Sequence, residues 1–347
     1  MNRARGTILI TGANGGLGSA IAKQVASQAQ YVAYHSLYAV RDATSALILS
    51  SILSENPEHP HDVISLDLTN LDKVREAAGS INARVAAEDL PQIQVLILNA
   101  GFQDFGQQVW TEDGLDMTFS ANYLGHWLLT LLLLRSMNKQ CGRIIVIGSQ
   151  SHDPYDKRNE KTNAFTDEKY KTILHDEASF EAIARGTWSS AQEDPSWLSG
   201  YRRYGAAKLF SVMMVHELQR RMDGDPVLNK VCILGVDPGT MISTGIQRRA
   251  NWIIRNFAFK FMYPIMATLM PNGLVRRPHK SASQVLRAAF DTGPALGEFP
   301  KGLYLFDNKL FETSVESRYV QKQELIWKES VQYVGLKTDE TILNNWQ

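Results

Sequence analysis

Short apolar runs alternate with longer amphipathic segments along most of the chain. Several runs are continuously apolar, as in parallel strands that are buried on both faces. The pattern predicts strands over residues 7–10, 37–40, 63–66, 95–98, 143–147, 230–236 and 303–306, and helices over residues 17–27, 71–87, 122–137, 203–221 and 281–290. This βαβαβ alternation predicts an α/β fold, a single Rossmann-type, doubly wound parallel sheet of about seven strands with helices on both faces.

Three segments depart from the alternation. Residues 152–200 are polar and irregular, and they form an insertion between the fifth strand and the next helix. Residues 240–280 follow the sixth strand, where a substrate lid is expected, and residues 313–347 form a partly helical C-terminal extension. Because no internal repeat or Pro-rich linker separates these parts, residues 1–347 are interpreted as one dinucleotide-binding catalytic domain.

The composition is that of an ordinary globular protein, with 347 residues, 44% hydrophobic content and a formal net charge of +0. A chain without net charge gives no reason to expect a nucleic acid partner. Its two cysteines, Cys141 and Cys232, have no metal-type partners nearby in the sequence, so no metal is expected. The first strand begins early and no run of about 18 apolar residues occurs, which together predict a cytoplasmic protein without signal peptide or membrane span.

The segment from Thr11 to Gly18 reads T-G-A-N-G-G-L-G and connects the first strand to the first helix. Glycines let a phosphate approach the backbone closely, and a helix N-terminus supplies N–H donors and a positive dipole. The turn therefore predicts a dinucleotide site, although a turn that merely needs small residues would have the same pattern. The candidate cofactor residues here are Gly12, Asn14, Gly16, Leu17 and Gly18.

The ends of the next three strands carry further candidates. At the end of the second strand an acidic residue favours NAD, whereas an arginine receives the additional phosphate of NADP. Arg41 stands there, 23 residues after Gly18 (41 − 18), and predicts NADP(H), while the adjacent Asp42 keeps NAD open. The third and fourth strands end at residues that would lie along the adenine and ribose, or else form a helix cap and a tight turn: Asp67, Leu68, Asn99, Ala100 and Gly101.

Tyr204 and Lys208, in Y-G-A-A-K, are one helical turn apart and share a face. A nearby ammonium lowers the pKa of a phenol, so this pair can exchange a proton near neutral pH. Ser149 ends the fifth strand, where its hydroxyl can polarise a carbonyl, and Asn122 begins a predicted helix and can hold a water that connects Lys208 to solvent. Taken singly, these residues could be a surface pair, a capping serine with Ser151 as competitor, and a helix cap. Their occurrence together predicts hydride transfer to or from a nicotinamide, with Tyr204 as proton donor or acceptor.

These motifs together resemble the short-chain dehydrogenase/reductase family. The resemblance covers roughly residues 7–306 and rests on T-G-A-N-G-G-L-G, D-L, N-A-G, N-Y-L-G-H, I-G-S, Y-G-A-A-K and D-P-G. It implies a catalytic tetrad of Asn122, Ser149, Tyr204 and Lys208, of which Tyr204 and Lys208 also contact the cofactor. It further implies that the nicotinamide is surrounded by Pro238, Gly239, Met241 and Ser243.

Parts of the chain resemble narrower groups within this family. N-Y-L-G-H and the apolar segment after the sixth strand are similar to the retinol-dehydrogenase-like branch, which acts on lipophilic carbonyls, and the chain as a whole is similar to fungal reductases of secondary metabolism. One departure is the interval of 55 residues from Ser149 to Tyr204 (204 − 149), far longer than is usual in the family. The rim of the site is therefore not predictable by analogy. Ser243, where threonine is commoner, is a milder departure.

Residues 238–290 contain no Asp or Glu but many basic and large apolar side chains, whereas the insertion is acidic. Three interpretations remain open. The basic side of the lid can pair with the insertion, residues 248–280 can contact an anionic internal membrane from the cytoplasm, or arginines can recognise an acidic substrate group. The resemblance also allows a homodimer through the helices at residues 122–137 and 203–221.

The sequence thus predicts an NADP(H)-dependent oxidoreductase that interconverts a bulky lipophilic ketone or aldehyde and its alcohol. Two alternatives stay open on the same fold. One is a redox-neutral reaction such as dehydration, cyclisation or epimerisation, and the other is a non-catalytic NADP(H)-binding regulator. Substrate identity, physiological direction and hydride face do not follow from the residues.

Overall fold

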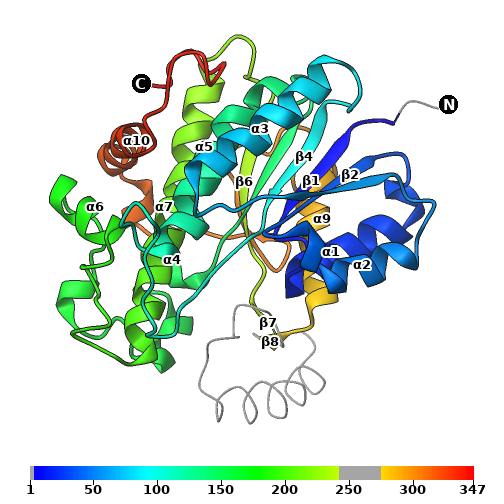
Figure 1. Cartoon of the computed structure of the whole chain (residues 1–347). Coiled ribbons are helices and arrows are strands. Elements are labelled where there is room, and N and C mark those ends of the chain that lie inside the picture. Colours follow the sequence, from blue (N-terminus) through cyan, green and yellow to red (C-terminus); the bar gives the residue numbers. More distant parts are fainter. Residues whose placement is uncertain (1–3, 242–274) are drawn as a thin grey trace.

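An eight-stranded sheet forms the centre of the protein, of which the computed structural model describes residues 4–241 and 275–347 (Figure 1). Its strands are β1 (Thr7–Thr11), β2 (His35–Val40), β3 (His61–Ser65), β4 (Ile93–Leu98), β5 (Arg143–Ile147), β6 (Cys232–Asp237), β9 (Tyr304–Phe306) and β10 (Lys309–Leu310). Their order is β10-β9-β6-β5-β4-β1-β2-β3, and only β9 with β10 is antiparallel. All seven predicted strands are present, in the doubly wound order whose reversal beside β1 marks a ligand site.

Within this sheet the apolar pattern missed β10, which is two residues long and pairs with β9. Asp307 and Asn308 connect the two strands with φ of 54° and 60°. This is the backbone conformation of a tight hairpin turn, which Asp and Asn tolerate better than most residues. A strand of two residues is too short to leave a periodic signal.

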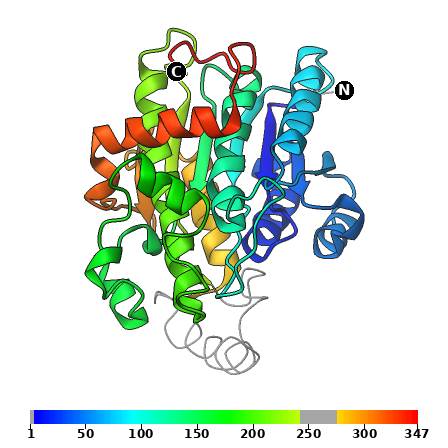
Figure 2. The same ribbon diagram turned by 60° about the vertical axis from the view of Figure 1, so that its left-hand side comes forward.

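Helices cover both faces of the sheet (Figures 1 and 2). One face carries α1 (Gly16–Ser27), α2 (Leu47–Ser54) and α9 (Pro278–Phe290), and the other carries α3 (Leu71–Ala86), α4 (Met117–Phe119), α5 (Gly125–Leu133), α7 (Trp197–Asp223) and, outside these, α10 (Val320–Val334). Ile8 and Ile10 pack in one apolar cluster and Leu9 in the other, because successive side chains of a strand point to opposite faces. Short helical turns complete this part of the chain: η1 (Ala29–Tyr31), η2 (Ala43–Ser45), the π-helical η3 (Ser120–Leu124), η4 (Leu134–Ser136) and η10 (Glu316–Arg318).

The insertion lies between β5 and α7 and is made of short turns. These are η5 (Gln150–His152), η6 (Lys157–Thr162), η7 (Glu168–Tyr170) and α6 (Glu177–Ala184). The side chains of Asp156, Asp167 and Asp176 begin three of them, each accepting a hydrogen bond from a backbone N–H a few residues later. Such caps satisfy amides that the start of a helix leaves unpaired. Part of the acidic character of the insertion therefore serves its own folding.

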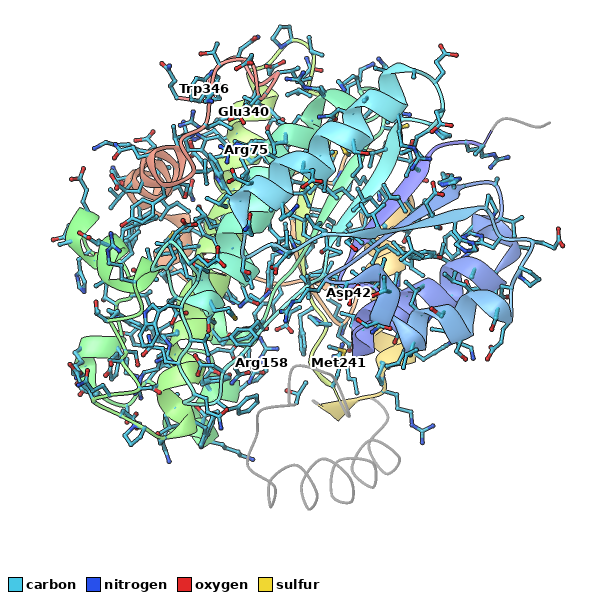
Figure 3. All side chains as sticks on the ribbon, viewed as in Figure 1. Asp42, Arg75, Arg158, Met241, Glu340 and Trp346 are labelled. Atoms are coloured by element: carbon cyan, nitrogen blue, oxygen red, sulfur yellow. The ribbon has the colours of Figure 1, made fainter. Side chains whose placement is uncertain are left out.

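The C-terminal extension folds back over the helices on one face. The ring of Trp327, in α10, lies 5.1 Å from that of Trp127, and the hydroxyls of Tyr123 and Ser330 are 2.7 Å apart. Further along, Arg75 of α3 pairs with Glu340 at 2.6 Å (Figure 3). Every residue of α5 is buried. A homodimer through α5, as the resemblance allows, would therefore require this cover to move.

One stretch of the described residues, Met117–Ser136, is long and apolar enough to cross a membrane by length and composition alone, with a mean hydropathy of 1.2. Inside the protein, however, 94% of the window that carries this hydropathy is buried. Burial of this kind is also typical of a helix in the core of a globular fold.

The predicted lid at residues 240–280 is described only near its two ends. β7 (Thr240–Met241) and β8 (Val275–Arg276) form a short parallel ladder in which Thr240 pairs with Val275. The ladder holds the two ends of the lid together, next to the D-P-G turn. Ser243 and residues 248–274 lie outside the described residues, so the roles expected for them stay predictions.

Candidate active site

The turn between β1 and α1 is packed so tightly that glycine is required at two positions. Gly12 has a φ of 66°, and a Cβ there would lie 2.8 Å from the Cα of Ala100. A Cβ on Gly18 would lie 2.2 Å from the carbonyl oxygen of Gly12. Because α1 begins at Gly16, the N–H groups of its first turn have no acceptor within the helix. This open helix N-terminus behind a close-packed turn fits the pyrophosphate of a dinucleotide.

Several candidate cofactor residues hold this turn in shape. The backbone N–H groups of Asn99 and Ala100 donate to the hydroxyl of Thr11 at 2.9 and 3.0 Å. The side-chain amide of Asn99 donates to the Thr11 carbonyl at 2.7 Å, and that of Asn14 accepts from the N–H of Leu49 at 3.0 Å. The loop after β4, which continues into Gly101, is thereby fastened to the glycine turn.

His126 is a member of this network that sequence reasoning passed over. Its Nε2 lies 2.9 Å from the Thr11 hydroxyl, and the side chain is buried. Burial, helped by the charge of Lys208, lowers the pKa of His126 to about 3. The ring is therefore neutral at physiological pH. The signal that could have revealed it is the last letter of N-Y-L-G-H, which places His126 one turn after Asn122.

Arg41 and Asp42 follow β2 and differ in how they are engaged. Arg41 is exposed. The carboxylate of Asp42 caps η2, where it accepts from the N–H and hydroxyl of Thr44 at 2.9 and 2.7 Å, and these bonds lower its pKa. Asp42 is exposed as well, but its carboxylate is engaged in this cap, so Arg41 is the candidate to contact a ligand phosphate.

Asp67 follows β3 and forms a similar turn. Its Oδ1 accepts from the N–H and hydroxyl of Thr69 at 2.9 and 2.7 Å. The neighbouring Leu68 is buried, and a Cβ on Gly125 would lie 2.1 Å from its carbonyl oxygen. Asp67 and Leu68 are thus held at the same carboxyl edge of the sheet as the glycine turn.

Lys208 is buried on the face of α7 that points toward β5. Its Nζ donates to the carbonyl of Ile147 at 2.8 Å and lies 5.5 Å from the centre of the Tyr204 ring. Burial lowers the pKa of Lys208 to about 8, against the opposing charge of Asp237. The hydrogen bond ties the lysine to the last residue of β5, two positions before Ser149.

Tyr204 lies beside Ser149. Burial and the nearby Tyr201 and Asp237 raise the pKa of Tyr204, while a hydrogen bond with Ser149 lowers it in part. The balance leaves Tyr204 protonated at neutral pH, as a proton donor must be. The net shift is upward, so the pKa depression that we expected from a nearby ammonium is not found for Tyr204.

Ser149 and Ser151 are both candidates for the serine that contacts a substrate carbonyl, and they differ in burial. Ser151 is fully buried, and its N–H and hydroxyl approach the Ser149 Oγ at 3.2 and 3.0 Å. Ser149 itself is only partly buried. With Ser151 donating to it, Ser149 keeps its own hydroxyl hydrogen for another acceptor.

Asn122 does not begin a helix, and that expectation was wrong. Asp116 caps the helical segment at Met117, and Asn122 lies within the π-helical turn η3. Its side chain bonds the N–H and C=O of Phe102 at 3.0 and 2.7 Å and the C=O of Thr118 at 2.7 Å. The side chain therefore braces the irregular turn against the loop after β4.

The D-P-G turn lies at the end of β6. The N–H of Gly239 donates to Asp237 Oδ1 at 2.9 Å, and the carbonyl of Pro238 accepts from the Ser281 hydroxyl at 2.8 Å. Met241 is the second residue of β7, and in Figure 3 it lies near Arg158 of the insertion, below the sheet. The turn is thus joined both to α9 and to the start of the lid.

Two further segments also reach the site. The sequence indicated this for the insertion, which follows β5, but not for the C-terminal extension. His152 accepts the N–H of Ser314 at Nε2, at 3.2 Å, and its Nδ1 lies 2.6 Å from the Ser149 carbonyl. The Tyr201 hydroxyl donates to Asn159 at 2.8 Å. Tyr304 is buried, and a Cβ on Gly148 would lie 2.2 Å from its hydroxyl oxygen. His152 and Tyr304 thus contact Ser149 and the adjacent Gly148.

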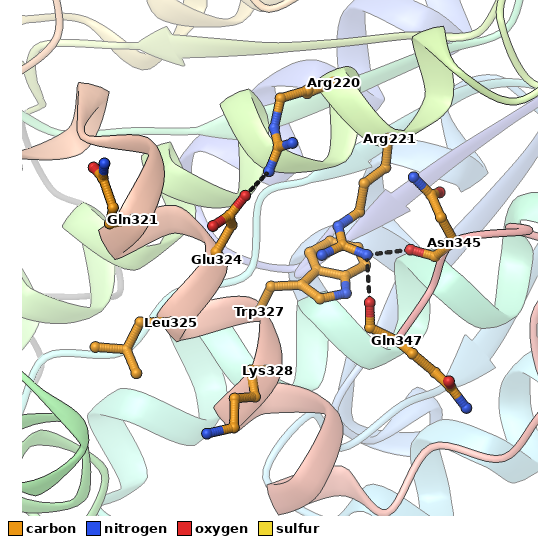
Figure 4. A pocket seen from close by; sticks show the side chains of 9 residues that line it. All are labelled: Arg220, Arg221, Gln321, Glu324, Leu325, Trp327, Lys328, Asn345 and Gln347. Atoms are coloured by element: carbon orange, nitrogen blue, oxygen red, sulfur yellow. Dashed lines mark hydrogen bonds and ion pairs between the residues drawn. The ribbon is translucent and has the colours of Figure 1, made fainter.

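A pocket of about 420 Å³ lies elsewhere, near the C-terminal end of α7 (Figure 4). It is bordered by Arg221, Trp327 and the last residues of the chain, and Arg221 bonds the carbonyls of Asn345 and Gln347. From Tyr204 to Arg221 the helix runs about 25 Å, so this pocket is separate from the residues just described.

Comparison with known proteins agrees with this arrangement. The family model for short chain dehydrogenases matches residues 6–157. Short-chain dehydrogenase iccH of Talaromyces variabilis is 39% identical to the chain over 99% of both proteins. This chain belongs to the short-chain dehydrogenase/reductase family. Protochlorophyllide reductase of Daucus carota is 26% identical over 96% of the chain and 79% of its own length.

Solved short-chain dehydrogenases/reductases share the fold. The NADPH-bound carbonyl reductase from chicken fatty liver superimposes with a TM-score of 0.56 at 15% identity, covering 90% of this chain and 100% of its own. The NADPH complex of L-sorbose reductase from Gluconobacter frateurii gives a TM-score of 0.58 at 14% identity, with 90% and 100% coverage. At such identities the likeness shows the architecture alone.

Proposed function

We propose that this short-chain dehydrogenase/reductase uses NADP(H) to interconvert a bulky lipophilic ketone or aldehyde and its alcohol. The observation that carries the proposal is the cluster of Tyr204, Ser149 and buried Lys208 where β5 meets α7. It lies at the carboxyl edge of the sheet, where α/β folds bind their ligands. The same edge carries the glycine turn.

The residues present fit the cofactor. A Cβ would fill the space at Gly12 and Gly18, and the first turn of α1 offers N–H donors to a pyrophosphate. Arg41 would receive the phosphate that distinguishes NADP from NAD, because its guanidinium presents a fixed fork of donors. When bound, the nicotinamide supplies or accepts a hydride.

The protein's own groups handle the proton. Tyr204 is protonated at neutral pH and can donate its hydrogen to a carbonyl oxygen. Ser149 can donate to the same carbonyl oxygen. Its own oxygen already accepts a hydrogen bond from Ser151, so its hydroxyl hydrogen stays available. The ammonium of Lys208 favours the phenolate that remains after transfer. In the oxidative direction the same groups act in reverse.

The substrate class rests on the family resemblance and on the apolar residues of the lid segment 240–280. The similarity to the Talaromyces variabilis dehydrogenase supports a place in fungal secondary metabolism. Redox-neutral chemistry and a regulatory role are the competing proposals on the same fold.

For location we propose the cytoplasm. Sedimentation with anionic vesicles tests the contact proposed for residues 248–280.

The deciding experiment follows oxidation of NADPH and NADH with a panel of lipophilic ketones, aldehydes and quinones. We expect turnover with NADPH, and a loss of about a hundredfold to ten-thousandfold in kcat for Tyr204→Phe, because general acid catalysis contributes about that much. Tyr319→Phe, at an exposed tyrosine, should leave kcat unchanged. Tight NADPH binding without turnover on any carbonyl would favour the redox-neutral or regulatory alternatives.

A further inference from the structure

A largely buried ion pair joins the insertion to the D-P-G turn. Asp237 ends β6, and its side chain is 4% exposed. Its Oδ2 accepts from Arg158 Nη1 at 2.8 Å, while its Oδ1 accepts from the N–H of Gly239. Arg158 comes from η6, 79 residues earlier in the chain. An acidic residue so placed brings a charge into the site that the catalytic tetrad does not include.

Arg158 is held as a permanent cation. Its Nη2 donates to Asp156 at 2.6 Å, and its guanidinium lies 4.3 Å from the centre of the Phe306 ring. Burial alone would lower the pKa of Arg158, but Asp156 and Asp237 raise it overall. Burying a charge costs several kcal/mol unless partners of this kind surround it. Arg158 therefore anchors η6, and its positive charge balances part of the negative charge of Asp156 and Asp237.

The charge of Asp237 reaches both members of the catalytic pair. It raises the pKa of Tyr204, after the larger effects of burial and Tyr201, and it opposes the lowering of the Lys208 pKa by burial. Without a counter-ion, the negative charge of Asp237 would oppose the formation of phenolate on Tyr204. With Arg158 beside it, Asp237 opposes phenolate formation less. The other titratable or charged groups around the ion pair, from every described element packed against it, are His152 (η5), Asp153 just after η5, Asp156 just before η6, Tyr201 (α7), Arg276 (β8), Tyr304 (β9) and Asp307.

We propose that Arg158 is a positioning residue of this enzyme, the counter-ion that holds Asp237 and thereby sets the charge balance around Tyr204 and Lys208. The active site thus depends on the insertion for more than the shape of its rim. This inference rests on the proposed reductase function for its kinetic consequence, but its electrostatic part concerns the protein alone.

The test compares Arg158→Met, Asp237→Asn and the double variant. Loss of Arg158 adds net negative charge near Tyr204, so the phenol should titrate at higher pH, by about one unit. Loss of Asp237 should move the titration the opposite way, and the double variant should return close to wild type. Arg185→Met is the matched control, because Arg185 also belongs to the insertion but its ion pair with Glu181 is exposed.

Two readouts separate this inference from the proposed function. The first is the ultraviolet titration of Tyr204 in cofactor-free protein, taken as the difference between each variant and the same variant carrying Tyr204→Phe. The second is the pH profile of kcat with NADPH, whose alkaline limb should move in the same direction. If neither the wild-type protein nor any variant turns over, the reductase proposal fails. The titration of Tyr204 still decides whether Arg158 sets the charge balance.

Opposite shifts in the two single variants, with return in the double variant, support the inference. A uniform loss of activity or stability without a shift in the titration would overturn it and leave Arg158 a purely structural anchor. If Arg158→Met fails to fold, Asp237→Asn still gives a decision, because it must shift the phenol titration to lower pH.

Discussion

At the residue scale, neighbouring side chains that follow the same strand have different roles. Asp42 closes a helical turn with Thr44, whereas Arg41 beside it is exposed at the edge that carries the glycine turn. Ser149 and Ser151 also differ in role. The buried Ser151 donates a hydrogen bond to Ser149, which is only partly buried. In each pair, local hydrogen bonding decides which side chain is left for a ligand.

This division predicts the effect of changing Arg41. Arg41→Ala should raise the KM for NADPH by about tenfold to a hundredfold, as expected for lost hydrogen bonds between charged groups, and leave the KM for NADH nearly unchanged. Steady-state kinetics with both cofactors measure this. Asp42→Asn serves as the control and should retain the preference for NADPH. An equal rise for both cofactors in Arg41→Ala would mean that Arg41 does not select NADP.

At the scale of elements, α7 positions Tyr204 and Lys208, the proposed catalytic pair. It runs from Trp197 to Asp223, longer at both ends than the apolar pattern predicted, and packs against η5. The approach is close at Gly205, where a Cβ would lie 2.5 Å from the carbonyl oxygen of Ser151. The small residue after Tyr204 thus lets the helix bring Tyr204 and Lys208 up to Ser149.

A pair of glycine substitutions tests this packing. Gly205→Ala should lower kcat at least tenfold and destabilise the protein by about 1–3 kcal/mol, because the added methyl pushes α7 away from backbone that cannot easily yield. Gly79→Ala, on α3 with nothing within 4 Å of the added Cβ, should stabilise by about 0.5–1 kcal/mol with unchanged kcat. Urea unfolding and initial rates measure both. Unaltered activity in Gly205→Ala would show that the contact is not needed.

At the scale of the whole molecule, burial of histidines makes stability depend on pH. Burial lowers the pKa of His126 to about 3, and it lowers those of His59 and His216 to about 4. The pKa of His152 is also lowered by burial. In the unfolded chain these rings would titrate near their ordinary value of about 6.5. Between these values the unfolded state binds more protons than the folded state, so stability rises with pH.

The free energy of unfolding should therefore fall as pH is lowered from 7 to about 5. Each of these histidines contributes up to about 1.4 kcal/mol per pH unit below its unfolded pKa, while most carboxylates stay ionised. Urea unfolding at the two pH values measures the change. His216→Gln should reduce the slope, and His175→Gln, at an exposed histidine, should not. Equal stability at both pH values would contradict the burial of these rings as neutral groups.

Local patterns in the sequence determined the seven parallel strands, the glycine turn and the Tyr204–Lys208 face. Each depends on spacings of a few residues, which backbone geometry converts directly into a shared face or a strand end. Strand and helix ends differed from the predicted bounds by a few residues. Short elements with weak periodicity, among them α2, α6, β7, β8 and β10, did not appear in the pattern at all.

Tertiary structure decided how distant segments complete the site. The bond from Arg158 to Asp237 spans 79 residues, and that from Ser314 to His152 spans 162. Such pairs form because the folded insertion and C-terminal extension deliver the two partners to one buried place, where an unpaired charge or N–H would be costly. No local spacing encodes that meeting. The sequence by itself therefore determined the chemistry of the site, and the packing of the chain decided its electrostatic surroundings.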